Sequence, residues 1–341
     1  MRRWGIWFSS ITLTWIIAAY FLITPALAHV PTFGGGGKSP EAAIPFKDPL
    51  ISRVLYGQLA EGDLIYYSFE LKQGERIALG IIVPVEQGRK GFTPDLILMG
   101  PGLTDEGKVP EKLEVPQGYG VKVFSGSLPE SPIYEAFAPS AFYSLASPDL
   151  SAPESGKYYV VASAARGEGN YGVVLGYEEA FTLMEWISTP LSQIEVYLWE
   201  GQSPLLVFAP LGIIFALGLL AIFLKKEIVA GFSPARISGI FAGLFFLGTG
   251  FSLVSQMLIS LSKTSYTSEV SITLFLILVS IILGVIALIL SLRDENYGAA
   301  STRKRLYFFG LGITGLLFWA GLFAGPLLSF IAALLPWKRK G

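Results

Sequence analysis

The sequence contains no cysteine and only one histidine, His29. Without cysteine the chain can form no disulfide bond, no thiolate metal site and no cysteine nucleophile. A single histidine also leaves no nucleophile–histidine–acid set to assemble. The sequence therefore favours a protein that is not an enzyme, with no catalytic residues and no bound cofactor.

Charged residues are also scarce. They make up 15% of the chain, against 52% hydrophobic residues, and the net charge is −1. Ordinary soluble domains carry about 25% charged residues. A nearly neutral chain produces no global field that would attract nucleic acid, so we expect no nucleic-acid partner. The composition points instead to a lipid bilayer as the surroundings of part of the chain.

Four long apolar stretches occupy the C-terminal part, at residues 204–224, 237–261, 270–292 and 306–335. A helix of about 20 apolar residues crosses a bilayer core, and each stretch reaches that length. Lipid offers no hydrogen bonds to an open backbone, so each stretch must be helical. The sequence predicts an α-helical transmembrane bundle of four helices within residues 204–341.

The interiors of these spans hold no Asp, Glu, Lys, Arg or His. Pumps and ion-coupled carriers normally place such residues within the bilayer, so their absence here disfavours a transporter. Gly239 with Gly243, and Gly321 with Gly325, have the spacing that lets helices approach closely. This spacing favours packing inside the bundle and leaves open a membrane protein partner.

The N-terminus has the pattern of an export signal. A basic start at Arg2 and Arg3 precedes apolar residues 6–23 and the small-residue motif Ala26-Leu27-Ala28. We predict a signal peptide over residues 1–28. The apolar run is long for a signal peptide, so an uncleaved signal anchor stays open. Residues 29–42, with glycine at each position from 34 to 37, are expected to form a flexible tether.

Residues 43–179 have the texture of an all-β domain. Short runs rich in β-branched and aromatic residues, such as 64–71, 76–83 and 171–177, are bounded by Gly, Pro, Asn or Asp. This pattern is typical of a sandwich or barrel. An insert lies between Leu103 and Ala152; its residues 121–124 also have a strand pattern, whereas its Pro-rich part from Pro129 on, with weak helical patterning at 136–145, is expected to be a long loop.

Several turn and core motifs of this segment follow the order of a known family: Gly57-Gln58-Leu59, Glu61-Gly62-Asp63, Tyr66-Tyr67-Ser68-Phe69, Gly74-Glu75-Arg76, Pro94-Asp95-Leu96, Ser155-Gly156-Lys157-Tyr158-Tyr159-Val160 and Gly169-Asn170-Tyr171. The segment resembles the bacterial pre-peptidase C-terminal domain. That resemblance implies a jelly-roll-like β-sandwich with a binding or accessory role and no catalytic residues. The Pro-rich insert and the fusion to membrane helices depart from the family.

Residues 180–203 join the β segment to the first span. Trp186, Tyr197 and Trp199 lie there among apolar residues and three glutamates. Aromatic side chains with a polar end gather at the headgroup level, so we expect an amphipathic segment at the outer membrane surface. A helix buried against the sandwich is the alternative.

Basic residues mark the loops after the first and third spans: Lys225, Lys226, Arg236, Arg293, Arg303, Lys304 and Arg305. Basic loops stay in the cytoplasm, so we expect a multi-pass cell-membrane protein with an extracytoplasmic β-domain. A single last span would place the basic residues 338–340 outside. A kink at Pro326 would return the tail to the inside, and both arrangements stay open.

Candidate ligands are few. As a mature N-terminal residue, His29 could bind copper through its imidazole, but no second histidine would support it. We therefore expect no stoichiometric copper. Asp63, Asp95, Asp105 and Asp149 could bind calcium but lack a dense loop pattern, and turn roles are favoured. The pair Glu111 and Glu114 is interpreted as a solvated edge.

Three classes of function follow from these observations. The favoured class is a non-enzymatic, membrane-anchored binding or accessory protein that presents a β-sandwich outside the cell. The first alternative is a transporter or channel subunit. The second is an exported copper-handling protein that uses His29.

Overall fold

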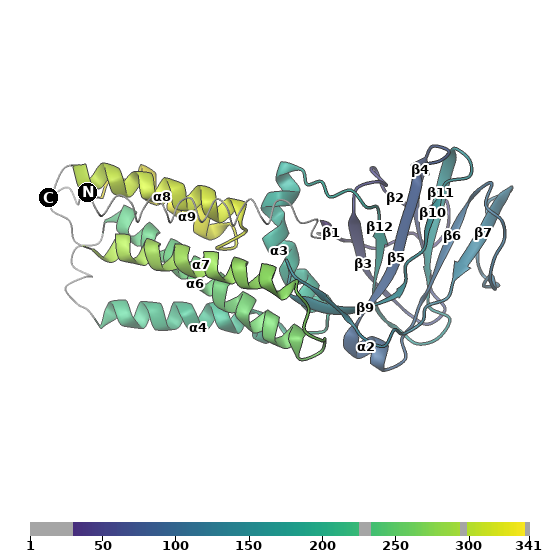
Figure 1. The fold of residues 1–341 in the computed structure, drawn as a ribbon, viewed down its shortest axis with the longest axis horizontal. Helices are drawn as coiled ribbons and strands as arrows, with labels where there is room; N and C mark the ends of the chain where they lie inside the picture. The colour runs from purple at the N-terminus through teal and green to yellow at the C-terminus, as the bar shows by residue number, and fades with distance from the viewer. Residues whose placement is uncertain (1–29, 225–232, 294–298, 338–341) are drawn as a thin grey trace.

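The computed structural model describes residues 30–224, 233–293 and 299–337. It is elongated, with a two-sheet β region at one end and a bundle of helices at the other (Figure 1). The predicted signal peptide and His29 lie outside the described residues. Helix α3 (Leu183–Trp199) lies between the two parts.

The β region, residues 30–178, contains a seven-stranded and a five-stranded sheet. The first has the order β1-β3-β12-β5-β9-β8, with β10 paired to β5, and the second the order β2-β4-β11-β6-β7. Most pairs are antiparallel, but β1 pairs with β3, and β2 with β4, in parallel. The strands are β1 (Val30–Phe33), β2 (Ile44–Pro45), β3 (Arg53–Leu59), β4 (Leu64–Leu71), β5 (Arg76–Pro84), β6 (Asp95–Pro101), β7 (Tyr119–Phe124), β8 (Ile133–Glu135), β9 (Ser140–Ala146), β10 (Asp149–Ser151), β11 (Gly156–Ser163) and β12 (Gly169–Leu175); a short helix, α2 (Val85–Arg89), follows β5.

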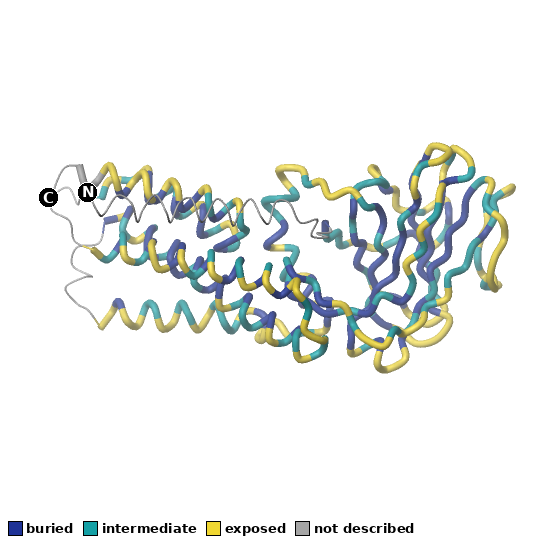
Figure 2. Tube along the Cα trace, viewed as in Figure 1, coloured by how far each residue is buried: buried dark blue, intermediate teal, exposed yellow. Residues whose placement is uncertain are grey.

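One apolar core joins the facing sides of the two sheets. In β4, Ile65, Tyr67 and Phe69 belong to this core, whereas Tyr66 belongs to a separate cluster on the other face. This alternation is the two-residue period of a strand. Two buried hydroxyls, of Tyr67 and Tyr171, form a 2.6 Å hydrogen bond within the core. Buried residues follow the strands between the sheets (Figure 2).

Two segments differ from the sequence-based expectation. Residues 30–33, expected in a flexible tether, form β1 and pair with β3. The Pro-rich insert, expected to be a long loop with weak helical patterning, contains β8, β9 and β10. Strand β9 pairs with β5 through residues 142–146, so partners far away in the sequence decide its conformation.

Among the described residues, three helices are long and apolar enough to cross a membrane: α4 (Pro204–Phe223), α6 (Pro234–Leu261) and α7 (Val270–Leu292). Ser203 and Ser233 cap the first turns of α4 and α6, and each is followed by proline at the first helical position. A serine cap satisfies a free N–H group, and proline has none to satisfy. Residues on the outward faces of α4 and α8 are largely exposed, as lipid-facing residues would be (Figure 2).

The fourth predicted span, 306–335, is not one helix. It forms α8 (Ala299–Leu317) and α9 (Ala324–Leu334), which run antiparallel. The Arg305 guanidinium of α8 donates to the carbonyl oxygens of Ala333 and Leu334 at the end of α9. The predicted count of four membrane helices is therefore not confirmed.

The turn between α8 and α9 has an unusual backbone. Gly321 has φ 81°, and Trp319, Leu322 and Phe323 also adopt positive φ values, of 52°, 50° and 63°. Only glycine takes such values without a steric cost. Pro326 lies in the first turn of α9, where its missing N–H breaks no helical hydrogen bond. The Gly321 N–H donates to the Thr249 hydroxyl of α6 at 3.1 Å, which fixes the turn to the bundle.

Helices α6 and α7 pack closely at a pair of glycines. A side-chain carbon placed on Gly243 would lie 3.1 Å from the carbonyl oxygen of Gly284, and one on Gly284 would lie 2.9 Å from that of Gly243. Small residues at such crossings let helix backbones approach each other. Within the described chain, Gly243 is therefore used for packing inside the bundle.

Candidate functional site

Helix α3 contacts the β region along one side. Thr182 caps it in a capping box with Glu185, which ties its first turn to the connecting chain. Near its end, the Trp199 ring packs edge-on against Tyr56 of β3, with centroids 4.9 Å apart. The Trp199 indole N–H donates to the carbonyl oxygen of Tyr171 at 3.0 Å. The predicted aromatic segment is thus seated on the outer face of the seven-stranded sheet.

The other side of α3 contacts the helical bundle. The Trp186 indole N–H donates to the carbonyl oxygen of Leu316 at 2.9 Å, and the Trp319 indole N–H donates to that of Trp186 at 2.9 Å. The two rings lie 4.6 Å apart between centroids. Helix α3 therefore contacts both parts of the molecule.

The β8–β9 hairpin makes a second contact between the two parts. The Tyr134 hydroxyl and the Thr273 hydroxyl of α7 lie 2.8 Å apart, and the Thr273 hydroxyl donates to the carbonyl oxygen of Ala136 at 2.6 Å. All three groups are buried, so their hydrogen bonds replace those lost from water. The β region is thereby attached to α7 as well as to α3.

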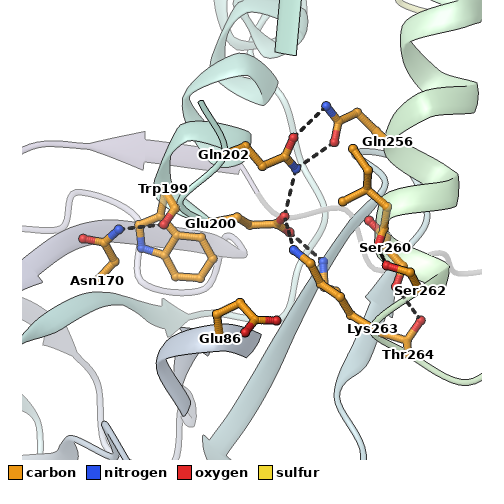
Figure 3. Close-up of polar contacts among 12 residues, drawn as sticks. Glu86, Asn170, Trp199, Glu200, Gln202, Gln256, Ser260, Ser262, Lys263 and Thr264 are labelled. Carbon is orange, nitrogen blue, oxygen red and sulfur yellow. Dashed lines mark hydrogen bonds and ion pairs between the residues drawn. The ribbon is translucent and has the colours of Figure 1, made fainter. Parts of the chain in front are cut away.

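A buried polar network forms the third contact (Figure 3). The Glu200 side chain is 1% exposed; it pairs with Lys263 at 3.5 Å and accepts the Ala141 N–H at 2.6 Å. Gln202 donates to the same carboxylate at 3.1 Å and exchanges two hydrogen bonds with Gln256 of α6, at 2.8 and 3.0 Å. Burial raises the pKa of Glu200, and the Lys263 ammonium acts in the opposite direction.

Between these contacts lies a cavity of about 520 Å³. One wall is the outer face of the seven-stranded sheet, including Tyr56, Ile82 and Val174. The facing wall comes from α3, the start of α7 and the α8–α9 turn, including Val196 and Trp319. Ligand sites are typically concave, mostly apolar and about 300–1,000 Å³ in volume. By these measures the cavity is the candidate functional site.

Glu135, the last residue of β8, lines this cavity and is partly exposed. Its carboxylate accepts the Phe137 N–H at 3.1 Å. Burial raises the pKa of Glu135 to about 7; the backbone N–H of Phe137 opposes this rise, and the nearby Glu269 carboxylate adds to it. Near neutral pH this carboxyl is therefore present in both its protonated and its ionised form.

The groups around Glu135 are acidic or phenolic. Glu269, just before α7, and Glu179, after β12, both raise its pKa. The pKa values of the Tyr56 and Tyr197 hydroxyls are also raised. Burial is the main cause, and the negative charges of Glu135 and Glu200 add to it. Among the described residues that line the cavity, Glu135 and Glu269 carry charge, and neither Lys nor Arg is present. The cavity therefore has an acidic end and apolar walls.

The four aspartates considered as calcium ligands lie apart, in turn and loop roles. Asp63 accepts the Ala60 N–H, Asp95 that of Gly126 and Asp105 that of Val121, whereas Asp149 pairs with Arg76: these contacts measure 3.0, 2.9, 2.9 and 2.7 Å. Glu111 and Glu114 are exposed. Within the described residues, no group of three or more His, Asp or Glu side chains could hold a metal.

Sequence reasoning missed Glu135 and Glu269. One signal was available, because Glu135 is the only charged residue between Glu130 and Asp149. An isolated carboxylate in an apolar segment is a candidate for a perturbed pKa. Its proximity to Glu269 could not be inferred, since only the packing of the β8–β9 hairpin on α7 brings them together.

No family model matches this chain, and no curated protein matches it. Several solved structures are similar to part of it. The PliG periplasmic inhibitor of g-type lysozyme from Aeromonas hydrophila is 16% identical, covering 44% of this chain and 100% of that one, with TM-score 0.23. PliG from Salmonella Typhimurium is 17% identical, covering 40% and 99%, with TM-score 0.22.

The pre-peptidase C-terminal domain of a Bacillus anthracis collagenase is 16% identical, covering 38% of this chain and 90% of that one, with TM-score 0.21. A member of the family that the sequence resembles is thus among the weak structural neighbours. At these TM-scores, the similarities assign neither a family nor a function to the chain.

Proposed function

We propose that the protein is a non-enzymatic, membrane-anchored binding protein, with a jelly-roll-like β-sandwich on the extracytoplasmic side. The observation that carries this proposal is the junction cavity of about 520 Å³, which lies between the β region and the helices. Its lining combines apolar side chains with polar ones, such as Ser140, Thr189 and Gln193, as ligand sites do. Contacts through α3, the β8–β9 hairpin and Glu200 hold its two walls together.

The proposed orientation follows from the position of the basic residues. Arg236 donates to the carbonyl oxygens of Ser291 and Leu292, and Lys304 to that of Arg293. These residues lie at the start of α6, the end of α7 and the start of α8, which form the end of the bundle away from the β region (Figure 1). Basic residues at span ends favour the cytoplasmic side. The β region then faces the outside.

Single cysteines introduced into this cysteine-free chain would test the orientation. Thr104, between β6 and β7, and Thr302, in the first turns of α8, are both exposed. In intact cells, a membrane-impermeant maleimide should label Thr104→Cys and should label Thr302→Cys only after permeabilisation. The reverse pattern would show that the β region faces the cytoplasm.

A second experiment would test binding. Ala138 lines the cavity, and Ala138→Trp should fill part of it. Native mass spectrometry of the protein released from mild detergent should show a bound small molecule that is lost in Ala138→Trp. Ala60→Trp, at an exposed position outside the cavity, is the matched control and should retain the molecule. A bound species that persists in Ala138→Trp would contradict a binding role for this cavity.

A further inference from the structure

The junction cavity has two chemically different regions. Tyr56, Ile82 and Val174 of the sheet and Val196 of α3 give it apolar walls. Glu135 reaches the same space from β8. Hydroxyl and amide groups, such as those of Ser140, Thr189 and Gln193, also line it. A molecule with an apolar body and one charged group would match the apolar walls and Glu135.

The acidic end of the cavity determines which charge the polar group of the ligand should carry. Glu135 and Glu269 are the charged residues among the described lining residues, and both are carboxylates. At low effective dielectric, an anionic ligand would be repelled by the ionised carboxylates, and a neutral one would gain no charge pairing with them. A cation would pair with the carboxylate through a charge-assisted hydrogen bond.

We propose that this cavity binds a small cationic amphiphile, with an apolar body and one protonated amine that pairs with Glu135. This inference rests on the proposed binding function and specifies its ligand class. The ligand's ammonium group donates to the Glu135 carboxylate and supplies the positive charge that no described lysine or arginine supplies in the lining of this cavity. Glu269, at the exposed end of the cavity, contributes a second, weaker attraction.

The raised pKa of Glu135 agrees with this assignment. In the empty cavity, burial keeps part of the Glu135 population protonated near neutral pH. A bound ammonium favours the ionised form, so binding and ionisation of Glu135 are linked. Amine binding should accordingly weaken as the pH falls below about 7, the pKa of Glu135.

Three molecules of nearly the same shape can test the proposal: 2-phenylethylamine, 2-phenylethanol and phenylacetate. They are cationic, neutral and anionic, and their binding to the full chain in phosphatidylcholine nanodiscs can be measured by calorimetry at pH 8. We expect one molecule of the amine to bind per chain, at least about tenfold more tightly than the alcohol or the acid, a difference of about 1.4 kcal/mol.

Three variants show whether amine binding depends on the Glu135 carboxylate itself or on the negative charge of the protein in general. Glu135→Gln keeps an oxygen for the Phe137 N–H and should weaken amine binding at least tenfold; Glu269→Gln should weaken it less. Glu111→Gln, at an exposed position between β6 and β7, should change nothing. Circular dichroism and gel filtration would verify folding of each variant. Equal affinity for all three molecules, no amine binding, or an unaffected Glu135→Gln variant would overturn the proposal.

The outcome is separable from that of the binding function itself. A bound species lost in Ala138→Trp, together with no preference for the amine, would refute the ligand class and leave the binding role intact. Nanodiscs that contain phosphatidylethanolamine would distinguish the source of the amine. If phosphatidylethanolamine in the nanodisc weakens the binding of 2-phenylethylamine, the site takes a lipid headgroup. If the affinity for 2-phenylethylamine stays the same, the site takes a soluble amine.

Discussion

Trp186 of α3 and Trp319 of the α8–α9 turn are linked by a tilted ring contact and by hydrogen bonding. Their ring centroids lie 4.6 Å apart, and the Trp319 indole N–H donates to the Trp186 carbonyl oxygen at 2.9 Å. The Trp186 indole N–H in turn donates to Leu316, in the last turn of α8. One pair of side chains thus joins the segment that supports the β region to the turn that closes the bundle.

Trp319→Phe should weaken this connection. It retains most of the ring and removes the N–H, so the Trp186 carbonyl loses its partner, at a cost of about 1–2 kcal/mol. We expect a lower melting temperature by circular dichroism and faster protease cleavage between residues 179 and 182. Trp337→Phe is the control, because Trp337 donates within its own segment, to Ala332. Equal cleavage of both variants would show that Trp319 does not secure the β region.

The buried pair of Glu200 and Lys263 gives a second prediction. The Glu200 and Lys263 side chains are 1% and 16% exposed, so removing the lysine leaves a carboxylate almost without solvent. Lys263→Ala should destabilise the protein by about 3–5 kcal/mol, and adding Glu200→Gln should recover part of that loss. Thermal melting of both variants would measure this. Lys90→Ala, at an exposed position on the β region, is the control and should melt like the native chain.

Glu135 should make stability depend on pH. Its folded pKa of about 7 lies above the ordinary value of 4.5, so the folded state binds the proton more tightly than the unfolded state. Stability is then greatest below the ordinary value and falls as the pH rises from 4.5 to about 7, by roughly 1–3 kcal/mol. Melting temperatures measured at several pH values should show this decrease.

Glu135→Gln should flatten that decrease, because glutamine does not titrate. Glu111→Gln should retain the full decrease. If Glu135→Gln and the native chain lost stability equally across this range, the titration of Glu135 would not be its cause.

The three helices that could cross a membrane were located from sequence because length and hydropathy define them. Predicted spans at 204–224, 237–261 and 270–292 correspond to Pro204–Phe223, Pro234–Leu261 and Val270–Leu292. The largest error, at the start of α6, arises because hydropathy ignores caps. Ser233 followed by Pro234 is a helix-start signal that a capping argument would have used.

The α8–α9 turn and the cavity could not be predicted in the same way. Hydropathy is uniform through the turn, whose positive φ values at Trp319 and Phe323 depend on tertiary contacts. Likewise, Glu135 and Glu269 are far apart in the sequence and meet only because β8–β9 packs on α7. Local patterns identify elements, whereas a site between elements depends on how they pack.

The close packing of α6 on α7 gives a prediction about bundle stability. Gly284→Val should force the backbones apart, because an added carbon would lie 2.9 Å from the Gly243 carbonyl oxygen. Overpacking of this kind typically costs about 1–3 kcal/mol and should lower the melting temperature. Gly212→Ala on α4, where an added carbon meets nothing within 4 Å, is the control. An unchanged Gly284→Val melting curve would mean that this contact is not tight.

The α8–α9 hairpin makes a prediction about the C-terminal tail. Arg305, near the start of α8, donates to the carbonyl oxygens of Ala333 and Leu334, so both ends of the hairpin lie at one level. Residues 338–340 lie outside the described residues; we predict that these basic residues share the side of Thr302, because basic residues prefer the cytoplasm. In intact cells, Gly341→Cys and Thr302→Cys should both escape an impermeant maleimide that labels Thr104→Cys. Labelling of Gly341→Cys without permeabilisation, with Thr302→Cys still protected, would instead support a single continuous span over 306–335.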